Sequence, residues 1–179
     1  MGKRSNAFAR RAQDFYPTPL AGVLPLLNHL MVGTKFYEPC AGAGDLIDHL
    51  QQFGHVCVGA SDIADHGEHP QVQPGIDCLH LLGVDADMFI TNPPWSREIL
   101  HDMILHLSQI RPTWLLIDAG WMHTKQSIPF MDYCLKIVSI GRVKWIEGSK
   151  HTGKDDCVWM HFDHYYRRLQ HPIMFRARS

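Results

Sequence analysis

Hydrophobic positions follow two patterns that alternate along the chain. Short apolar runs predict strands at residues 35–37, 56–61, 88–91, 114–118, 142–147 and 158–162. Apolar residues three or four positions apart predict helices at residues 20–30, 45–53, 97–110 and 128–138. Strands and helices that alternate in this way are typical of an α/β fold built on a parallel sheet.

The last two predicted strands differ from the others because no helix separates them. They flank a polar stretch at residues 148–156, which predicts a hairpin loop. We therefore expect a mainly parallel sheet that ends in an antiparallel hairpin. The sequence has no internal repeat, no low-complexity stretch and no linker-like composition, so residues 1–179 are expected to form a single domain.

Composition narrows the class of protein. Hydrophobic residues make up 45% of the chain and charged residues 20%, which is ordinary for a globular protein and excludes a disordered or collagen-like one. The apolar runs are too short to span a bilayer, so no membrane partner is expected. Five cysteines without a Cys-x-x-Cys pair predict reduced thiols in the cytoplasm. The His-containing segment 65–69 matches no standard zinc spacing, and no metal site is expected.

Basic residues gather at the two ends of the chain. Residues 1–11 carry four bases and no acid, residues 164–179 carry four more, and the segment between them holds all 18 acids. Basic ends of this kind can contact a polyanion while the acidic middle binds a cationic group. Solvated tails that keep the protein soluble are the alternative, and charge alone does not separate the two.

Residues 36–45 lead from a predicted strand through a turn of small residues into a predicted helix. Gly42 and Gly44 permit backbone conformations and a close approach that a side chain would prevent. The turn does not continue as Gly-x-Gly-x-x-Gly, and no Lys-Ser or Lys-Thr pair follows to hold phosphates. A nucleoside triphosphate is therefore not the expected ligand.

Three acids stand at or near the ends of successive strand-like segments. Glu38 ends the first and favours a cationic ligand, whereas Asp62 ends the next and can accept the two hydroxyl hydrogens of a ribose. Asp77 follows where it can accept an adenine amino group. Each carboxylate alone is more often a turn or cap residue, but three in this arrangement indicate a ligand crevice.

The segment Thr91-Asn92-Pro93-Pro94-Trp95 follows the predicted strand at residues 88–91. Pro94 restricts Pro93 to an extended conformation, so the Pro93 carbonyl is presented rigidly beside the side-chain oxygen of Asn92. Two acceptors placed in this way suit an NH₂ group, and Trp95 offers a flat face for a planar amine-bearing ring. The alternative is a proline-rich loop with Trp95 in the core.

Together, Glu38-Pro39-Cys40-Ala41-Gly42 and Asn92-Pro93-Pro94-Trp95 resemble motifs I and IV of the S-adenosylmethionine-dependent amino-methyltransferases, most closely the DNA adenine-N6 methyltransferases. Residues 14–19, Asp-Phe-Tyr-Pro-Thr-Pro, resemble the N-terminal motif that closes over the methionine end of the cofactor. The resemblance spans residues 14–163. The small size and the terminal hairpin also resemble compact phage or prophage enzymes, whose compartment is the cytoplasm of a bacterium or of a phage-infected host cell.

This resemblance implies a Rossmann-like class I methyltransferase fold and S-adenosylmethionine as the cofactor. The residues that it implies for cofactor binding are Tyr16, Thr18, Glu38, Pro39, Cys40, Ala41, Gly42, Asp62, Ile63, Asp77 and Asn92. The implied catalytic residues are Asn92, Pro93, Pro94 and Trp95, with Trp95 stacking on the target base. The target adenine must leave the helix or be single-stranded, because its amine is otherwise paired.

The chain departs from the family in one respect, since no stretch remains for a separate target-recognition domain. Recognition is then expected from loops, from the basic ends, or from a second copy of the chain or a partner subunit, with short or relaxed specificity. The predicted phosphate contacts are Lys150, His151, Lys154, Arg167 and Arg168. RNA in place of DNA, and a non-catalytic subunit that binds the cofactor for a partner enzyme, remain the alternatives. Trp145 and Trp159 are expected to pack across the hairpin.

Overall fold

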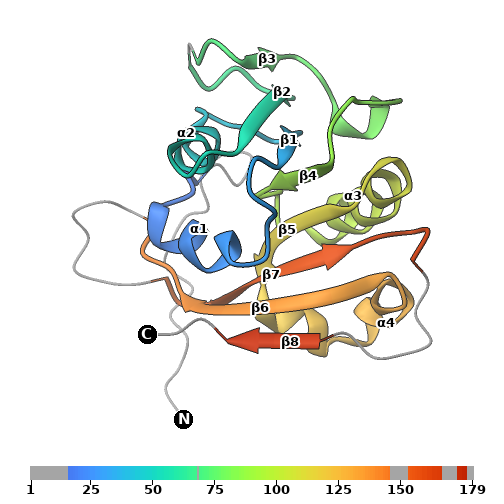
Figure 1. Cartoon of the computed structure of the whole chain (residues 1–179). Coiled ribbons are helices and arrows are strands. Elements are labelled where there is room, and N and C mark those ends of the chain that lie inside the picture. Colours follow the sequence, from blue (N-terminus) through green and yellow to red (C-terminus); the bar gives the residue numbers. More distant parts are fainter. Residues whose placement is uncertain (1–15, 68, 146–152, 167–172, 177–179) are drawn as a thin grey trace.

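The structure, a computed structural model, describes residues 16–67, 69–145, 153–166 and 173–176 of the 179-residue chain (Figure 1). Its helices are α1 (Leu20–Leu27), α2 (Asp45–Gln52), α3 (Arg97–Ile110) and α4 (Ile128–Met131), with short 3₁₀ turns η2 (Cys78–His80), η3 (Ala119–His123) and η4 (Lys125–Ser127). Its strands are β1 (Lys35–Glu38), β2 (Val56–Asp62), β3 (Val72–Pro74), β4 (Met88–Thr91), β5 (Thr113–Asp118), β6 (Cys134–Arg142), β7 (Asp156–Phe162) and β8 (Ile173–Arg176).

Within these ranges the strands form one sheet in the order β3-β2-β1-β4-β5-β7-β6-β8. Strands β1 to β5 pair in parallel, and β7 lies antiparallel to both β5 and β6. The predicted Rossmann-like α/β sheet that ends in an antiparallel hairpin is confirmed. Beyond the hairpin, β8 adds a strand parallel to β6 that the hydrophobic pattern did not indicate.

Helices cover both faces of the sheet, with α1 and α2 on one face and α3 on the other (Figure 1). The central strand β5 shows why its residues form a strand. Trp114 and Leu116 pack with α1 and α2, whereas the alternate residues Leu115 and Ile117 pack with α3, and all four are buried. A strand buried on both faces needs apolar side chains at every position, and this rigid centre holds the strand ends in place.

Two predicted elements near the end of the chain are wrong. The helix expected at residues 128–138 ends at Met131, and its second half belongs to β6. Ile137 and Val138 are both buried, on opposite faces of the sheet, and pair with β7, so the β-branched side chains and the cross-strand pairing prevail over the helical spacing. The strand expected at 142–147 is correct only at Arg142, and residues 146 and 147 lie outside the described residues.

The order of the strands reverses at β1, since β2 lies on one side of it and β4 on the other. In an open parallel sheet, the carboxyl ends of the strands at such a reversal border a ligand crevice. Glu38 ends β1 and Asn92 directly follows β4, so both residues stand at this crevice. Within the ranges described above, no helix is both long enough and apolar enough to cross a membrane.

Candidate functional site

A cavity of about 510 Å³ lies at the strand reversal. Every residue that the sequence analysis assigned to cofactor binding lines it, which brings together Tyr16, Thr18, Glu38, Pro39, Cys40, Ala41, Gly42, Asp62, Ile63, Asp77 and Asn92. Pro94 lines it too, whereas Pro93 and Trp95 do not. The segments that carry the two motifs, 54 positions apart from Glu38 to Asn92, therefore meet at one cavity.

The turn after β1 is fixed by the end of β2. The Gly42 N–H donates to Oδ2 of Asp62 at 2.8 Å, and the Ala41 N–H donates to the Ser61 carbonyl at 3.0 Å. Gly44 stands at the start of α2 with φ of +91°, a conformation that favours glycine. A β-carbon at Gly44 would lie 2.5 Å from Cγ of His69, so any larger residue there would displace the ring of His69.

Glu38 is 1% exposed, and its Oε2 is buried without a hydrogen-bond partner in the described part of the chain. Burial raises the pKa of Glu38 well above its ordinary value, and repulsion from Asp62 and then Asp45 adds to the rise. A buried, unpartnered carboxylate oxygen is costly unless a donor meets it. A cationic donor such as an ammonium group would satisfy it, which is the group that the methionine end of S-adenosylmethionine would present.

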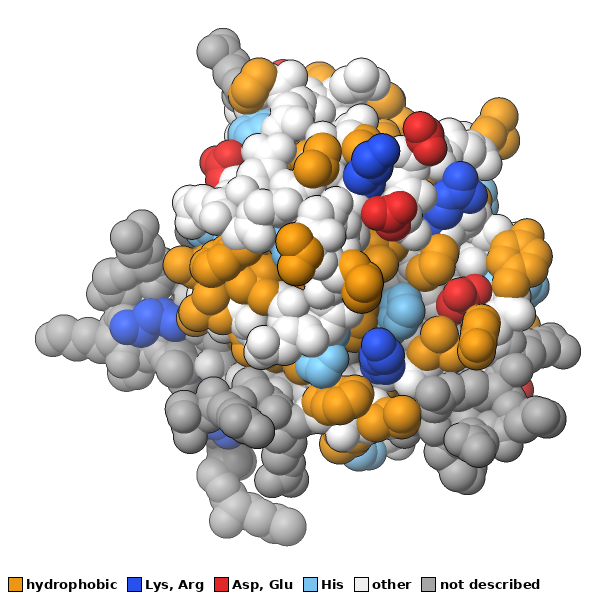
Figure 2. Space-filling view, viewed as in Figure 1, with side chains coloured by type: hydrophobic (Ala, Val, Ile, Leu, Met, Phe, Trp, Pro, Cys, Tyr) orange, Lys and Arg blue, Asp and Glu red, His pale blue; other side chains and the backbone are white. Residues whose placement is uncertain are grey.

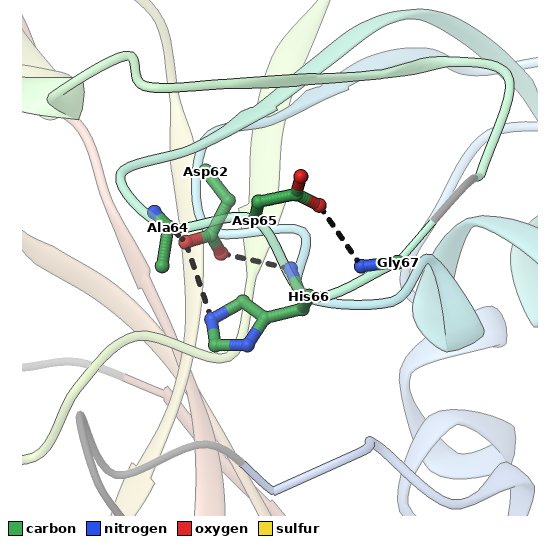
Figure 3. Close-up of polar contacts among 6 residues, drawn as sticks. Asp62, Ala64, Asp65, His66 and Gly67 are labelled. Atoms are coloured by element: carbon green, nitrogen blue, oxygen red, sulfur yellow. Dashed lines mark hydrogen bonds and ion pairs between the residues drawn. The ribbon is translucent and has the colours of Figure 1, made fainter.

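The Asp62 carboxylate joins the turn to the next loop (Figure 3). Besides the bond from Gly42, its Oδ1 accepts from the Ala64 N–H at 2.9 Å and lies 3.6 Å from Nε2 of His66. A carboxylate has about four acceptor positions, so these backbone bonds leave capacity for a ligand hydroxyl. The neighbouring Ile63 is 63% exposed and lines the cavity, where it offers an apolar surface for a flat ring.

Asp77 has a local structural role as well. Its Oδ1 accepts from the Leu79 N–H at 2.9 Å and thereby caps η2, and its Oδ2 lies 3.9 Å from Nδ1 of His80. Asp77 still borders the cavity, so contact with an adenine amino group remains a prediction.

Asn92 is held in one orientation by the segment that precedes α1. Its Nδ2 donates to the Tyr16 carbonyl at 3.3 Å and to Oγ1 of Thr18 at 3.2 Å. A carbonyl can only accept, so the atom of Asn92 that faces Tyr16 must be the amide nitrogen. The side-chain oxygen Oδ1 therefore points away from this segment, and among the described residues it accepts no hydrogen bond. It is available as an acceptor for a ligand.

Trp95 lies at the edge of this site, half-buried. Its Nε1 donates to the Leu116 carbonyl at 3.0 Å, and its ring meets Trp145 edge to face at a centroid distance of 5.6 Å. The ring also packs against both hydrophobic clusters that flank the sheet. Trp95 is thus anchored in the core in part, and its stacking on a target base stays a prediction.

The predicted phosphate contacts are only partly described. Lys154 is exposed, whereas Lys150, His151, Arg167 and Arg168 lie outside the described residues. On the face shown in Figure 2, the Lys and Arg side chains that the structure describes stand apart from one another and form no continuous basic patch. The nucleic-acid contacts that the sequence analysis named remain a prediction.

Several cavity residues were not predicted. His66, Cys78, Ser96, Ile99 and Met103 line it; Ser96 directly precedes α3, and Ile99 and Met103 lie in the first half of that helix. The helix that begins at Arg97 closely follows the Asn-Pro-Pro segment. The sequence could therefore have placed residues of the first turns of this helix near the cavity. His66 stands in a polar loop, and no pattern in the sequence distinguishes it.

No protein-family model and no curated protein matches this sequence. Among solved structures, a protein of Pyrococcus horikoshii assigned as an RNA methyltransferase matches with a TM-score of 0.62 and 15% identity over 89% of this chain and 91% of its own. A Listeria monocytogenes protein assigned as a class I S-adenosylmethionine-dependent methyltransferase matches with a TM-score of 0.59 and 12% identity, over 97% and 68%. The chain has the class I methyltransferase fold.

A third match is to a subunit of a larger system. The methyltransferase subunit of a type I restriction-modification system from Streptococcus thermophilus matches with a TM-score of 0.55 and 11% identity, over 90% of this chain and 47% of that subunit. This chain therefore spans about half the length of that subunit. At such low identities, the likeness is one of fold.

Proposed function

We propose that this protein transfers a methyl group from S-adenosylmethionine to the N6 amine of adenine in DNA, with short or relaxed sequence specificity. The observation that carries the proposal is the orientation of Asn92. Its amide nitrogen is engaged by Tyr16 and Thr18, so its oxygen remains to accept from a ligand at the rim of a cavity. The class I methyltransferase fold of the chain and the Asn-Pro-Pro-Trp motif support it.

The cavity residues divide among the parts of the cofactor. Tyr16, Thr18 and Glu38 would hold the methionine end, since the buried Glu38 oxygen suits an ammonium group. Asp62 would accept from the ribose, and Asp77 from the adenine amino group. Pro39, Cys40, Ala41, Gly42 and Ile63 would supply backbone and apolar contacts along the same wall.

The target amine needs polarisation rather than a strong base, because its nitrogen lone pair is delocalised into the purine ring. When bound, S-adenosylmethionine supplies an electrophilic methyl group on a positively charged sulfur. Oδ1 of Asn92 and the Pro93 carbonyl would accept the two amine hydrogens, which directs the lone pair toward that methyl. With the amine held by these two acceptors, the new N–C bond would replace the S–C bond of the cofactor, whose electron pair would stay with the sulfur, and the extra proton of the product amine would pass to solvent. Pro94 would hold the loop in an extended conformation, and Trp95 would stack on the target base.

RNA is the second candidate substrate, since one solved structure of the same fold is assigned as an RNA methyltransferase. The residues at the site are the same for both. A non-catalytic role beside a partner enzyme is the third. The match to the methyltransferase subunit of a type I restriction-modification system supports the presence of a partner but not the loss of catalysis. If another subunit recognises the target sequence, that subunit is a second copy of this chain or such a partner.

Methyl transfer from labelled S-adenosylmethionine to unmethylated DNA, RNA and protein tests the proposal. We expect label in DNA as N6-methyladenine, reduced about 100-fold or more in Asn92→Ala, because removing one such acceptor or donor at a reacting centre costs that much. Asn28→Ala, an exposed residue at the end of α1, is the matched control and should behave as wild type. Label only in RNA favours the second candidate. Cofactor binding with no label anywhere favours the third, and failure to bind the cofactor overturns the proposal.

A further inference from the structure

Three aromatic rings from distant parts of the chain meet beside the Asn92 loop. The ring of Trp145 lies 6.3 Å from that of Tyr16, centroid to centroid, and 5.6 Å from that of Trp95. Trp145 follows β6, Tyr16 precedes α1, and Trp95 follows β4. Trp145 thus contacts both the N-terminal segment and the loop after β4, which the hydrogen bonds of Asn92 also join, whereas the sequence predicted only packing across the hairpin.

The backbone around Trp145 holds its ring in place. The Gly153 N–H donates to the Val143 carbonyl at 2.7 Å, which brings the chain after the hairpin loop back beside Trp145. A β-carbon at Gly153 would lie 3.0 Å from Cδ1 of the Trp145 indole and 2.8 Å from the Val143 carbonyl oxygen. The Cδ1–Nε1 edge of the indole therefore lies close to a residue that has no side chain, and Trp95 meets the indole at an interplanar angle of 78°.

Each of the two neighbours of Trp145 is tied to the candidate site. The Tyr16 carbonyl accepts from the amide of Asn92, and Tyr16 lines the cavity. Trp95 directly follows Pro94, which also lines the cavity, and its indole N–H is anchored on β5. A ring that packs against both segments fixes the distance between them. Loss of that ring would leave the Asn92 hydrogen bonds to Tyr16 and Thr18 in place but would remove the contact that links Tyr16 to the ring of Trp95.

We propose that Trp145 is a positioning residue that couples the cofactor cavity to the target-base side of the site. This inference rests on the proposed function, because it assumes that a nucleobase binds beside Asn92 and Trp95. A ligand in the cavity would contact Tyr16, and Trp145 would transmit that contact to Trp95. Cofactor and target would then bind more tightly together than separately, which is a coupling free energy between two sites.

Equilibrium binding tests the coupling without requiring turnover. A fluorescein-labelled single-stranded oligonucleotide that contains adenines is titrated with and without S-adenosylhomocysteine, the demethylated product of the cofactor. We expect this product to tighten oligonucleotide binding at least fivefold in wild type and less than twofold in Trp145→Ala. The KM for nucleic acid in methyl transfer should rise in Trp145→Ala by the factor that the coupling loses, about 2.5-fold or more, whereas the Kd for S-adenosylmethionine alone and kcat change less than twofold.

Trp145→Phe retains a ring beside Gly153 and should restore at least half of the wild-type tightening, about 2.5-fold or more. Phe53→Ala, a half-exposed aromatic residue at the far end of α2, is the control for losing a ring elsewhere and should leave the coupling unchanged. Wild-type coupling in Trp145→Ala overturns the inference alone. The inference is also overturned if Trp145→Ala lowers kcat, cofactor affinity and Tm together and Trp145→Phe does not restore them. A purely structural role predicts that pattern. A wild-type chain that neither binds nor methylates nucleic acid overturns both proposals.

Discussion

Replacing Glu38 by Gln should make the free protein more stable and its cofactor binding weaker. Burial, followed by repulsion from Asp62 and Asp45, raises the pKa of Glu38 well above 4.5. The folded chain then binds this proton more tightly than the unfolded chain does. The stability that follows is fully present below about pH 4.5, and it is lost as the pH rises through the raised value. On account of this group, the free wild-type protein is therefore less stable at pH 7 than at about pH 4.5. Glu38→Gln has no ionisable group at this position, so it does not lose this stability.

The size of both effects follows from burial. An unpaired buried polar group costs about 1–3 kcal/mol, and more when it is charged. Glu38→Gln keeps a polar group at this position but removes its charge, so relief of the part of the cost that is due to the charge should raise Tm at pH 7 by about 3–10 °C for a chain of this size, and the two proteins should converge near pH 4. A hydrogen bond between charged groups contributes about 1.5–3 kcal/mol, so the Kd for S-adenosylmethionine should rise about 10- to 150-fold.

Thermal melting from pH 4 to pH 8, with and without S-adenosylmethionine, measures both effects on the same samples, and calorimetric titration gives the Kd. Glu98→Gln is the matched control, because Glu98 is an exposed residue of the first turn of α3 and undergoes the same chemical change. Unchanged cofactor affinity in Glu38→Gln would mean that this carboxylate does not hold the ammonium group. A lower Tm than wild type at pH 7 in the free variant would refute the argument from burial.

Two further changes test the turn and the sheet. Gly44→Ala should destabilise the fold by about 1–2 kcal/mol from the left-handed backbone, and further through contact with His69, whereas Gly54→Ala, with φ of +82° and open space around it, incurs only the backbone cost. Chemical denaturation of both variants separates the two, and equal losses would mean that the His69 ring simply moves. Burial lowers the pKa of His161, stacked on Trp114, to about 4. Because the folded state resists its protonation, wild type should lose up to about 3 kcal/mol between pH 6.5 and 4. His161→Phe should retain most of that stability when Tm is measured between about pH 6.5 and 4. An equal fall of Tm in this range in wild type and variant would contradict the argument.

Residues at the strand ends could be placed from the sequence because the sheet itself places them. Once β1, β2 and β4 are parallel neighbours, Glu38, Asp62 and Asn92 must reach the same edge. The apolar runs that define these strands are short and unambiguous. The glycine turn was equally predictable, since its residues lack the bulk that the backbone geometry excludes.

Other features depend on contacts that no local pattern records. Residues 134–138 satisfy both a helical and a strand spacing, and only the pairing with β7 decides between them. The orientation of the Asn92 amide depends on acceptors 76 and 74 positions earlier in the chain. The three-residue edge strand β3 is only half-buried at Val72 and exposed beyond it, so it has no hydrophobic signature.

The N-terminal segment borders both parts of the candidate site, the cavity and the Asn92 side chain. Thr18 is 5% exposed and meets the Asn92 amide, while Tyr16 contributes one carbonyl to that amide, one ring to Trp145 and a wall to the cavity. The same few residues therefore border the cavity and set which atom of Asn92 is free to accept. If the cavity holds the cofactor, the acceptor for the target is oriented by a cofactor-binding segment. A separate domain is then not required to align the two substrates, since the alignment is made by one segment that contacts both.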